Sequence, residues 1–389
     1  MGFATAPAVG PLQGYLLSQC DVEVAAEPLN QLPHQDVIEA QAQQVADTFA
    51  NFVASATASL DICIYDFRLD FDAVRQTIVD AINSAADRGV SVRIAYDKAQ
   101  ESEDGPILKQ FRMAGGDPAP VGTDQFLRVG AGLRDAVATR AVSEEAIDPG
   151  SQIMHQKFMI KDGSTETAAV WTGSTNFTVD AWALQDNNIL VVSACPQLAA
   201  AYGQEFEELW DNAAITGTGS AGSATVDGQA IGYAFAPADG PQIESDIATL
   251  IGGATRRLRV ASMVTSSQPI LTALKNQIDA GRDFAGVYDL GETANVRSAW
   301  EKTGASAKVA LLDAVTVAMV AKNSIPYSPQ NAHNFMHNKI VVADDTTLTG
   351  SFNFSRNATR NAENILVIDN PDLANLYAGY IASLVSRYR

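Results

Sequence analysis

Strand and helix patterns of apolar residues occur in the same order in both halves of the chain. Residues 59–67, SLDICIYDF, alternate between apolar and polar positions, which predicts a strand. A helical pattern follows at residues 73–89, and a second β-rich stretch covers residues 90–97. The same order of strand, helix and strand returns in the second half, at residues 256–264, 269–281 and 283–289. Units of this length predict parallel strand pairs joined by right-handed crossovers.

Three further blocks occur once in each half and in one order. They are MHQKFMIKDG and MHNKIVVADD, TGSTNFT and TGSFNFS, and DNNILVV and AENILVI. The first residues of these pairs are 154 and 336, 172 and 349, and 186 and 362. Turn-forming residues separate the apolar runs of the first block from the next Gly-Ser, so each half is predicted to contain a β-hairpin. The histidines lie 182 positions apart and the later asparagines 177 apart, which makes the first hairpin five residues longer.

The repeat predicts two similar halves. A chain of 389 residues is long enough for two ordinary cores. We place an N-terminal extension at residues 1–40, the halves at 41–215 and 228–389, and a linker at 216–227. The linker contains GTGSAG, which matches the glycine pattern of dinucleotide-binding loops. That motif requires a preceding strand, whereas EFEELWDN has a helical pattern, so we interpret GTGSAG as a linker or turn.

Composition and charge narrow the classes of function. Apolar residues make up 47% and charged residues 18%, as in globular proteins. The formal net charge of −19 disfavours a surface that binds nucleic acid through its phosphates, although a locally basic cleft remains compatible with it. The longest apolar run, at residues 309–321, is interrupted by Asp313 and is too short to span a membrane.

The amino terminus and the cysteines say little about the compartment or the function of the protein. The first residues lack the basic start and continuous apolar centre of a signal peptide, which leaves a cytoplasmic or a mature secreted protein as alternatives. Cys20, Cys63 and Cys195 have no metal-ligand spacing and are expected to be buried thiols.

The repeated blocks carry the candidate chemistry. A single H-x-K-x4-D pattern is most simply a strand start with solvated charges, but here it occurs twice, each time followed by Gly-Ser-x-Asn-Phe. Histidine acts as nucleophile, acid or base near neutral pH. Lysine neutralises negative charge on phosphoryl oxygens, and asparagine donates hydrogen bonds to them without adding charge. Two copies facing each other would place one histidine on each side of a phosphorus atom, as in-line displacement of a phosphodiester requires.

With these motifs the chain resembles the phospholipase D superfamily. The paired signature consists of His155, Lys157, Asp162, Gly173, Ser174 and Asn176, and of His337, Lys339, Asp344, Gly350, Ser351 and Asn353. The resemblance implies two α/β halves, each a mixed β-sheet flanked by helices, related by a pseudo-twofold axis with one active site between them. It also implies that one histidine becomes phosphorylated while the other acts as acid and base, without a metal or other cofactor.

Individual roles follow from the alignment of the halves. Glu363 is aligned with Asn187, and the resemblance implies that an acidic residue here orients a motif histidine, which we expect to be His337. A carboxylate partner favours the imidazolium form, so His337 is expected to be the acid and His155 the nucleophile. Asp186 is an alternative partner in the first half.

Other polar and aromatic residues have two interpretations. Asp162 and Asp344 are expected to be structural charges paired with basic groups across the interface, with Ser174 and Ser351 in supporting positions. His333 either lines the mouth of the site or is an ordinary surface histidine. Trp182 and Tyr327 either contact an organic head group or serve packing.

The sequence therefore predicts a phosphodiesterase that hydrolyses a phosphodiester or transfers it to an alcohol, acting on phospholipid head groups. A metal-independent endonuclease of the same superfamily is the alternative, which the net charge disfavours. A non-catalytic scaffold is weaker, because both histidines and both lysines are present. A monomer is expected because one chain contains both motifs.

Overall fold

The computed structural model describes residues 2–98, 130, 132–142, 152–216, 219–328 and 331–389. These residues form two eight-stranded mixed sheets with flanking helices. The first sheet has the order β1 (Phe3–Thr5), β2 (Leu12–Leu17), β10 (Asn187–Val192), β8 (Ala169–Gly173), β7 (Lys157–Lys161), β3 (Ser59–Ile64), β5 (Ser91–Asp97) and β6 (Ala138–Val142). The second has the order β11 (Gly222–Val226), β12 (Gln229–Ala236), β18 (Glu363–Asp369), β17 (Thr346–Gly350), β16 (Lys339–Ala343), β13 (Arg257–Ser262), β14 (Asp283–Asp289) and β15 (Val320–Lys322).

The order of strands is the same in both sheets, so the predicted fold of two similar α/β halves is confirmed. Strands β3 and β5 are parallel, as are β13 and β14. The predicted hairpins are β7 with β8 and β16 with β17. Their connections, residues 162–168 and 344–345, confirm the longer first hairpin.

The edges of the sheets extend the two halves beyond the boundaries expected from the sequence. Strand β2 pairs antiparallel with β10, and β1 pairs with β2, so residues 3–17 belong to the first half. Strands β11 and β12 occupy the equivalent positions of the second sheet. Of the GTGSAG stretch, residues 217–218 lie outside the described part of the chain. Its last glycine begins β11, so a strand follows it where a dinucleotide-binding loop would be followed by a helix.

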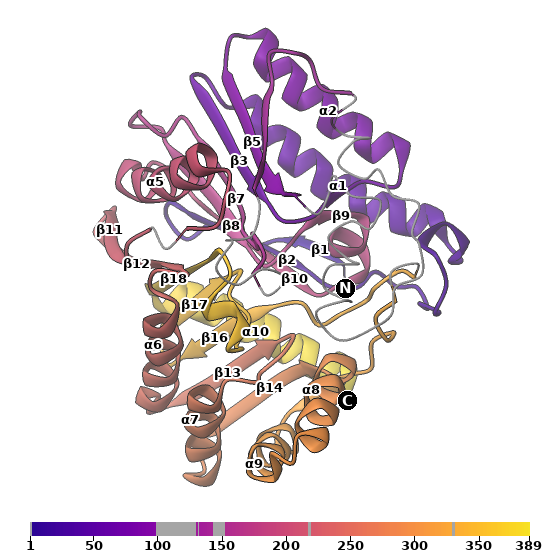
Figure 1. The fold of residues 1–389 in the computed structure, drawn as a ribbon, viewed down its shortest axis with the longest axis vertical. Helices are drawn as coiled ribbons and strands as arrows, with labels where there is room; N and C mark the ends of the chain where they lie inside the picture. Colours follow the sequence, from indigo (N-terminus) through magenta and orange to yellow (C-terminus); the bar gives the residue numbers. More distant parts are fainter. Residues whose placement is uncertain (1, 99–129, 131, 143–151, 217–218, 329–330) are drawn as a thin grey trace.

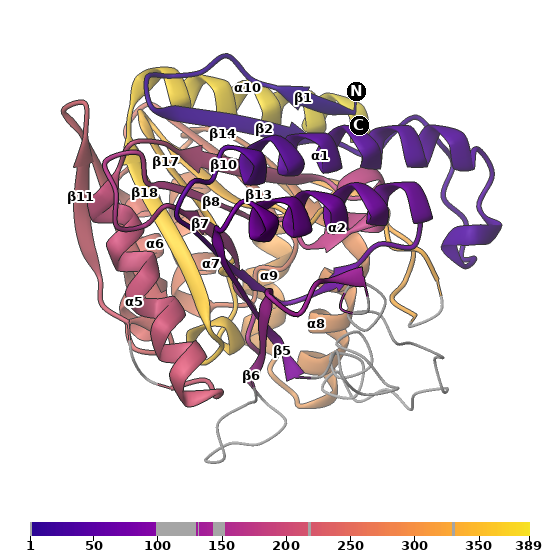
Figure 2. The ribbon, with the colours of Figure 1, turned by 90° about the horizontal axis from the view of Figure 1, so that it is seen from above.

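Helices cover both faces of each sheet, which gives the molecule a layered arrangement (Figures 1 and 2). The helices are α1 (Gln35–Ala54), α2 (Asp72–Asp87), α5 (Pro196–Asn212), α6 (Gly240–Gly253), α7 (Gln268–Asp279), α8 (Leu290–Lys302), α9 (Ser306–Thr316) and α10 (Pro371–Tyr388). Apolar residues of α1 and α2 pack on the outer face of the first sheet, and those of α6, α7 and α9 on the outer face of the second. A third core between the sheets contains α5 and α10. The halves therefore share a continuous apolar interface.

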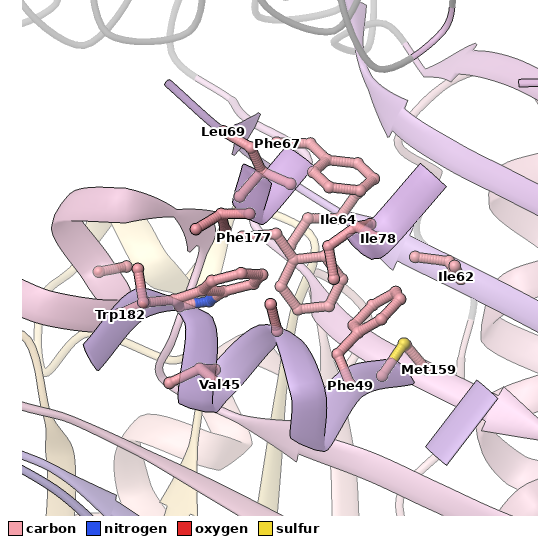
Figure 3. Packing of buried hydrophobic residues seen from close by; sticks show 14 of the residues in the cluster. Val45, Phe49, Ile62, Ile64, Phe67, Leu69, Ile78, Met159, Phe177 and Trp182 are labelled. Carbon is pink, nitrogen blue, oxygen red and sulfur yellow. The ribbon is translucent and has the colours of Figure 1, made fainter. Parts of the chain in front are cut away.

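The first-half core explains one aromatic residue that the sequence left open. Trp182 is 1% exposed and packs near Phe177, at a ring-centroid distance of 6.2 Å. Phe177 in turn packs edge-to-face against Phe49 of α1 at a ring-centroid distance of 5.4 Å, and Figure 3 shows the three residues in this core. Trp182 is thus a core residue and lies away from the cavity described below. Full burial of one large apolar side chain stabilises the folded state by roughly 2–3 kcal/mol.

The three cysteines are buried free thiols, as predicted. Among the described residues, the helices are all too short or too polar to cross a lipid bilayer.

Candidate active site

The two motif histidines are placed by backbone contacts between the halves. The His155 amide donates a hydrogen bond to the Ala362 carbonyl oxygen at 3.0 Å, and the His337 amide donates to the Asp186 carbonyl oxygen, also at 3.0 Å. Each histidine therefore sits at the start of a strand in its own half and is held by the other half. Because these contacts fix the main chain, the two imidazoles are brought to one cavity.

Buried aspartates at the ends of two parallel strands fix the residue before each histidine. Asp97 accepts a hydrogen bond from the Met154 amide at 2.9 Å, and Asp289 accepts one from the Met336 amide at 2.9 Å. The sequence analysis did not single out these aspartates. Their signal is that both predicted strands, VSVRIAYD and DFAGVYD, end in Asp.

Each imidazole is oriented by a side chain of the opposite half, and one expectation is wrong here. Nδ1 of His155 lies 2.8 Å from a carboxylate oxygen of Glu363, whereas Nδ1 of His337 lies 2.9 Å from Oδ1 of Asn187. Glu363 is therefore the partner of His155 and not of His337. The alignment of the halves correctly pairs Glu363 with Asn187, but pairing across the interface reverses which histidine each one contacts.

Asp186 does not orient a histidine through its side chain. Its carboxylate forms a buried ion pair with Lys322 at 2.8 Å and accepts a hydrogen bond from the Tyr388 hydroxyl at 2.8 Å. This excludes Asp186 as the carboxylate partner that the sequence left as an alternative. It acts on His337 only through the main chain.

The serines of the Gly-Ser pairs support the orienting residues. Oγ of Ser174 donates to Oδ1 of Asn187 at 2.7 Å. Oγ of each serine also accepts a hydrogen bond from a main-chain amide of the following strand. Ser174 accepts from Asn188 and Ser351 from Asn364, at 3.0 Å each.

The glycines before these serines are required by the backbone. Gly173 and Gly350 have φ values of 144° and 148°. A Cβ atom at either position would overlap a main-chain carbonyl oxygen of the neighbouring strand. The Gly-Ser pair thus lets two strands approach closely below the histidines.

The two motif lysines are fully buried below the histidines. Nζ of Lys157 donates to the His155 carbonyl oxygen at 2.7 Å, and Nζ of Lys339 donates to the His337 carbonyl oxygen. Lys157 also lies 5.1 Å from the ring centroid of Tyr65. A bound anion beside these two buried amines would favour their charged forms.

Burial dominates the electrostatics of this cluster. It lowers the pKa of His155 and His337 well below the ordinary value, and the charges of Lys157 and Lys339 lower it further. Burial also lowers the pKa of Lys157 to about 7 and raises that of Glu363 to about 8. A bound phosphodiester anion would offset the lysine charges and raise the pKa of both imidazoles.

The motif aspartates are structural, but their partners differ from the expectation. Asp162 accepts hydrogen bonds from the amides of residues 57–59, and Asp344 accepts them from the amides of residues 255–257. All these partners belong to the same half, so neither aspartate pairs with a basic group across the interface. Burial alone would raise their pKa, but the amide hydrogen bonds outweigh it and lower the pKa of both carboxyls.

A cavity of about 450 Å³ opens above the histidines. His155, His337, Asn176 and Asn353 all line it, so the structure brings together the residues of both motifs. Oδ1 of each asparagine is buried and has no hydrogen-bond partner among the described residues. The Nδ2 groups of these asparagines are donors that suit the oxygens of a phosphate.

Several cavity residues were missed or left open by the sequence analysis. Tyr65, Asp66 and Arg68 follow strand β3, and Glu292 lies in the first turn of α8. Their only signal is that polar residues cluster where predicted strands end. His333 is 2% exposed and lines the cavity, so it is not a surface histidine.

In the described part of the chain, no three His, Cys, Asp or Glu side chains are grouped in a way that would hold a metal ion. The site is built from imidazole, amine and amide groups, which suit a phosphate oxygen directly.

Known proteins share this architecture. Of the solved structures, a phosphatidylserine synthase from Haemophilus influenzae has a TM-score of 0.54 and 13% identity, covering 93% of this chain and 85% of that one. A polyphosphate kinase from Porphyromonas gingivalis has a TM-score of 0.50 and 11% identity, over 89% of this chain and 51% of that one. At such identities the similarity concerns the fold alone.

Sequence comparison is more specific. A mitochondrial cardiolipin hydrolase from Chlamydomonas reinhardtii is 30% identical over 163 residues, which are 42% of this chain and 56% of the relative. The match thus spans just over half of that relative. The family model described as cardiolipin synthase, phospholipase D-like domain, matches residues 49–210 and 247–385. With both motifs inside the matched ranges and meeting at one cavity, the chain belongs to the phospholipase D-like family.

Proposed function

We propose that the protein is a phosphodiesterase that cleaves phospholipid head groups through a phosphohistidine intermediate. The observation that supports this most is the placement of His155 and His337 in one cavity, each held at Nδ1 by the opposite half. With Nδ1 engaged, Nε2 is the ring nitrogen available to each histidine for phosphorus or for a leaving oxygen.

The proposed reaction has two displacements. Nε2 of His155 attacks phosphorus, the bond to the leaving alcohol breaks, and His337 donates its Nε2 proton to that oxygen. His337 then removes a proton from water, whose oxygen attacks phosphorus as the bond to nitrogen breaks. The phosphate monoester leaves, and both histidines return to their starting states. An alcohol in place of water gives transfer instead of hydrolysis.

The corrected pairing of Glu363 gives a new reason for His155 as nucleophile. In its ionised form, which the charge of Lys157 favours against burial, Glu363 accepts a hydrogen bond from Nδ1–H of His155, and the Nε2 lone pair is then free to attack. The same carboxylate offsets the positive charge of the imidazole once phosphorus is attached. Asn187 orients His337 without adding negative charge, and the substrate anion raises the pKa of His337 for its role as acid.

A lipid substrate is favoured by charge and by similarity. The net charge of −19 opposes approach of a long polyanion. The curated relative, 30% identical over 163 residues, is named as a cardiolipin hydrolase. We therefore infer a phospholipid before a nucleic acid.

The test is an activity screen without added metal, together with trapping of the intermediate. The substrates are phosphatidylcholine, cardiolipin, single-stranded DNA and bis(p-nitrophenyl) phosphate. Turnover of a phospholipid, with mass spectrometry locating the phosphoryl group on His155 after rapid quenching without acid, is the expected result. An adduct on His337 would reverse the two roles, and turnover of DNA alone would replace the lipid substrate by a nucleic acid.

A further inference from the structure

The two motif lysines and the acidic residues of the lining lie on different sides of the cavity, the lysines behind the histidines and not in the lining itself. Below the histidines lie the buried amines of Lys157 and Lys339. The wall formed after β3 and by the start of α8 instead carries the carboxylates of Asp66 and Glu292. A ligand that fits such a cavity has a negative and a positive group within a short distance of each other.

Among the described residues that line the cavity, Arg68 carries the guanidinium, and it is already paired. Nε of Arg68 lies 3.2 Å from a carboxylate oxygen of Asp66, and its Nη2 lies 3.6 Å from a carboxylate oxygen of Asp180. The same Asp180 carboxylate lies 3.6 Å from Nδ1 of His333. Arg68 is thus shared between two carboxylates and leaves none of its charge for Glu292.

Glu292 is the carboxylate of this wall without a partner. Its main-chain amide donates a hydrogen bond to Oδ1 of Asp289 at 3.1 Å. Its side chain makes no hydrogen bond or ion pair with any described residue. Burial, with a smaller contribution from Asp289, raises the pKa of Glu292 to about 7. A cation beside this half-buried carboxylate would lower its pKa and stabilise its ionised form.

An aromatic stack borders the same space. The ring of His333 lies between Tyr327 and Phe335, with centroid distances of 5.0 Å and 5.1 Å and interplanar angles of 12° and 9°. All three residues line the cavity, and the pKa of Tyr327 responds to the charge of Glu292. Aromatic faces next to a carboxylate bind organic ammonium groups.

We propose that Glu292 is a specificity-determining residue that binds a cationic group on the alcohol portion of the substrate. The proposal rests on the proposed phosphodiesterase function and narrows it to zwitterionic phosphodiesters, such as esters of amino alcohols. Phosphate sits over the lysines, and the ammonium group lies between Glu292 and the Tyr327, His333 and Phe335 stack. A neighbouring phosphate of a nucleic acid would meet Glu292 instead and be repelled.

The test compares two phospholipids with identical short acyl chains, dihexanoyl phosphatidylcholine and dihexanoyl phosphatidylglycerol. The measured quantity is the ratio of their kcat/KM values, because this ratio cancels changes that affect both substrates equally. We expect the wild type to favour the choline ester and Glu292→Gln to lower the ratio about 10-fold, equivalent to about 1.4 kcal/mol. Glu301→Gln is the matched control, since Glu301 is an exposed residue on the same helix paired with Arg297 at 3.3 Å.

Three results would overturn the assignment of Glu292. They are a wild-type preference for phosphatidylglycerol, an unchanged ratio in Glu292→Gln, and turnover of bis(p-nitrophenyl) phosphate with neither phospholipid accepted. Absence of turnover on every phosphodiester is a different outcome, because it rejects the proposed function itself.

Discussion

The two halves of the molecule share one strand order but differ at single aligned positions around the site. Glu363 orients His155, whereas Asn187 orients His337. One layer further from the cavity, Gln156 donates to the carboxyl group of Glu205 at 2.9 Å, while Asn338 donates to the hydroxyl of Tyr380 at 3.1 Å.

These differences show how a repeated fold can provide two different acid–base environments. The main chain holds the two histidines in equivalent positions, by one amide–carbonyl hydrogen bond of 3.0 Å to the opposite half in each case. In the proposed mechanism the two histidines take different roles because a carboxylate lies 2.8 Å from one Nδ1 and an amide oxygen 2.9 Å from the other. Each half therefore supplies the group that orients the histidine of the other half, and neither half forms the cavity alone.

The largest expected effect comes from removing either histidine. His155→Asn and His337→Asn should each reduce kcat/KM on an alkyl phosphodiester at least about 1000-fold, or roughly 4 kcal/mol. With bis(p-nitrophenyl) phosphate the halves should differ, because p-nitrophenolate leaves without a proton and His337→Asn should retain more activity than His155→Asn. His34→Asn, at an exposed position, is the control, and circular dichroism verifies folding. Substantial activity in either variant on the alkyl ester would refute a shared site.

A smaller difference is expected when the orienting residues are removed. Glu363→Gln should reduce kcat about 100-fold, because His155 loses the charge that stabilises its phosphorylated form, and Asn187→Ala should reduce kcat about 10-fold. Single-turnover kinetics should place the Glu363→Gln defect in formation of the intermediate. Equal losses in the two variants would show that the carboxylate and the amide are interchangeable.

The motif aspartates should behave alike in both halves. Asp162→Asn and Asp344→Asn should each lower the free energy of unfolding by about 1–3 kcal/mol, since each carboxylate binds three main-chain amides. Because the folded pKa lies below the ordinary 3.8, the wild-type contribution is present above that pH and is lost on further acidification. Urea unfolding at neutral pH measures it, and an unchanged kcat at saturating substrate would distinguish this structural role from a catalytic one.

The last prediction concerns the pH dependence of stability at Glu205, which has no carboxylate counterpart at the aligned Tyr380. Burial raises the pKa of Glu205 from 4.5 to about 8, so between these values the folded form holds a proton that the unfolded form releases. Stability should therefore fall as pH rises across this range, by roughly 1.4 kcal/mol for each pH unit. Glu205→Gln should reduce the slope by this amount, as measured by denaturant unfolding at several pH values, while the exposed control Glu23→Gln should keep the wild-type slope. A pH profile identical to that of the wild type would contradict the buried protonated state.

The sequence by itself determined the repeat, the family and most residues of the site. Motif spacing depends on strand geometry within each half, so His155 with Lys157, the hairpins and the strand–helix–strand units could be predicted from local periodicity. The motif aspartates were correctly interpreted as structural, although their amide partners were not foreseen.

Only the tertiary structure decided which residues of one half contact which residues of the other. The pairing of Glu363 with His155 depends on how two sheets pack through α5 and α10, and no local pattern encodes that arrangement. The same holds for strand β2, which gains its partner from β10, and for the acidic wall around Glu292. These contacts join residues more than a hundred positions apart, where apolar packing and not sequence spacing sets the distance.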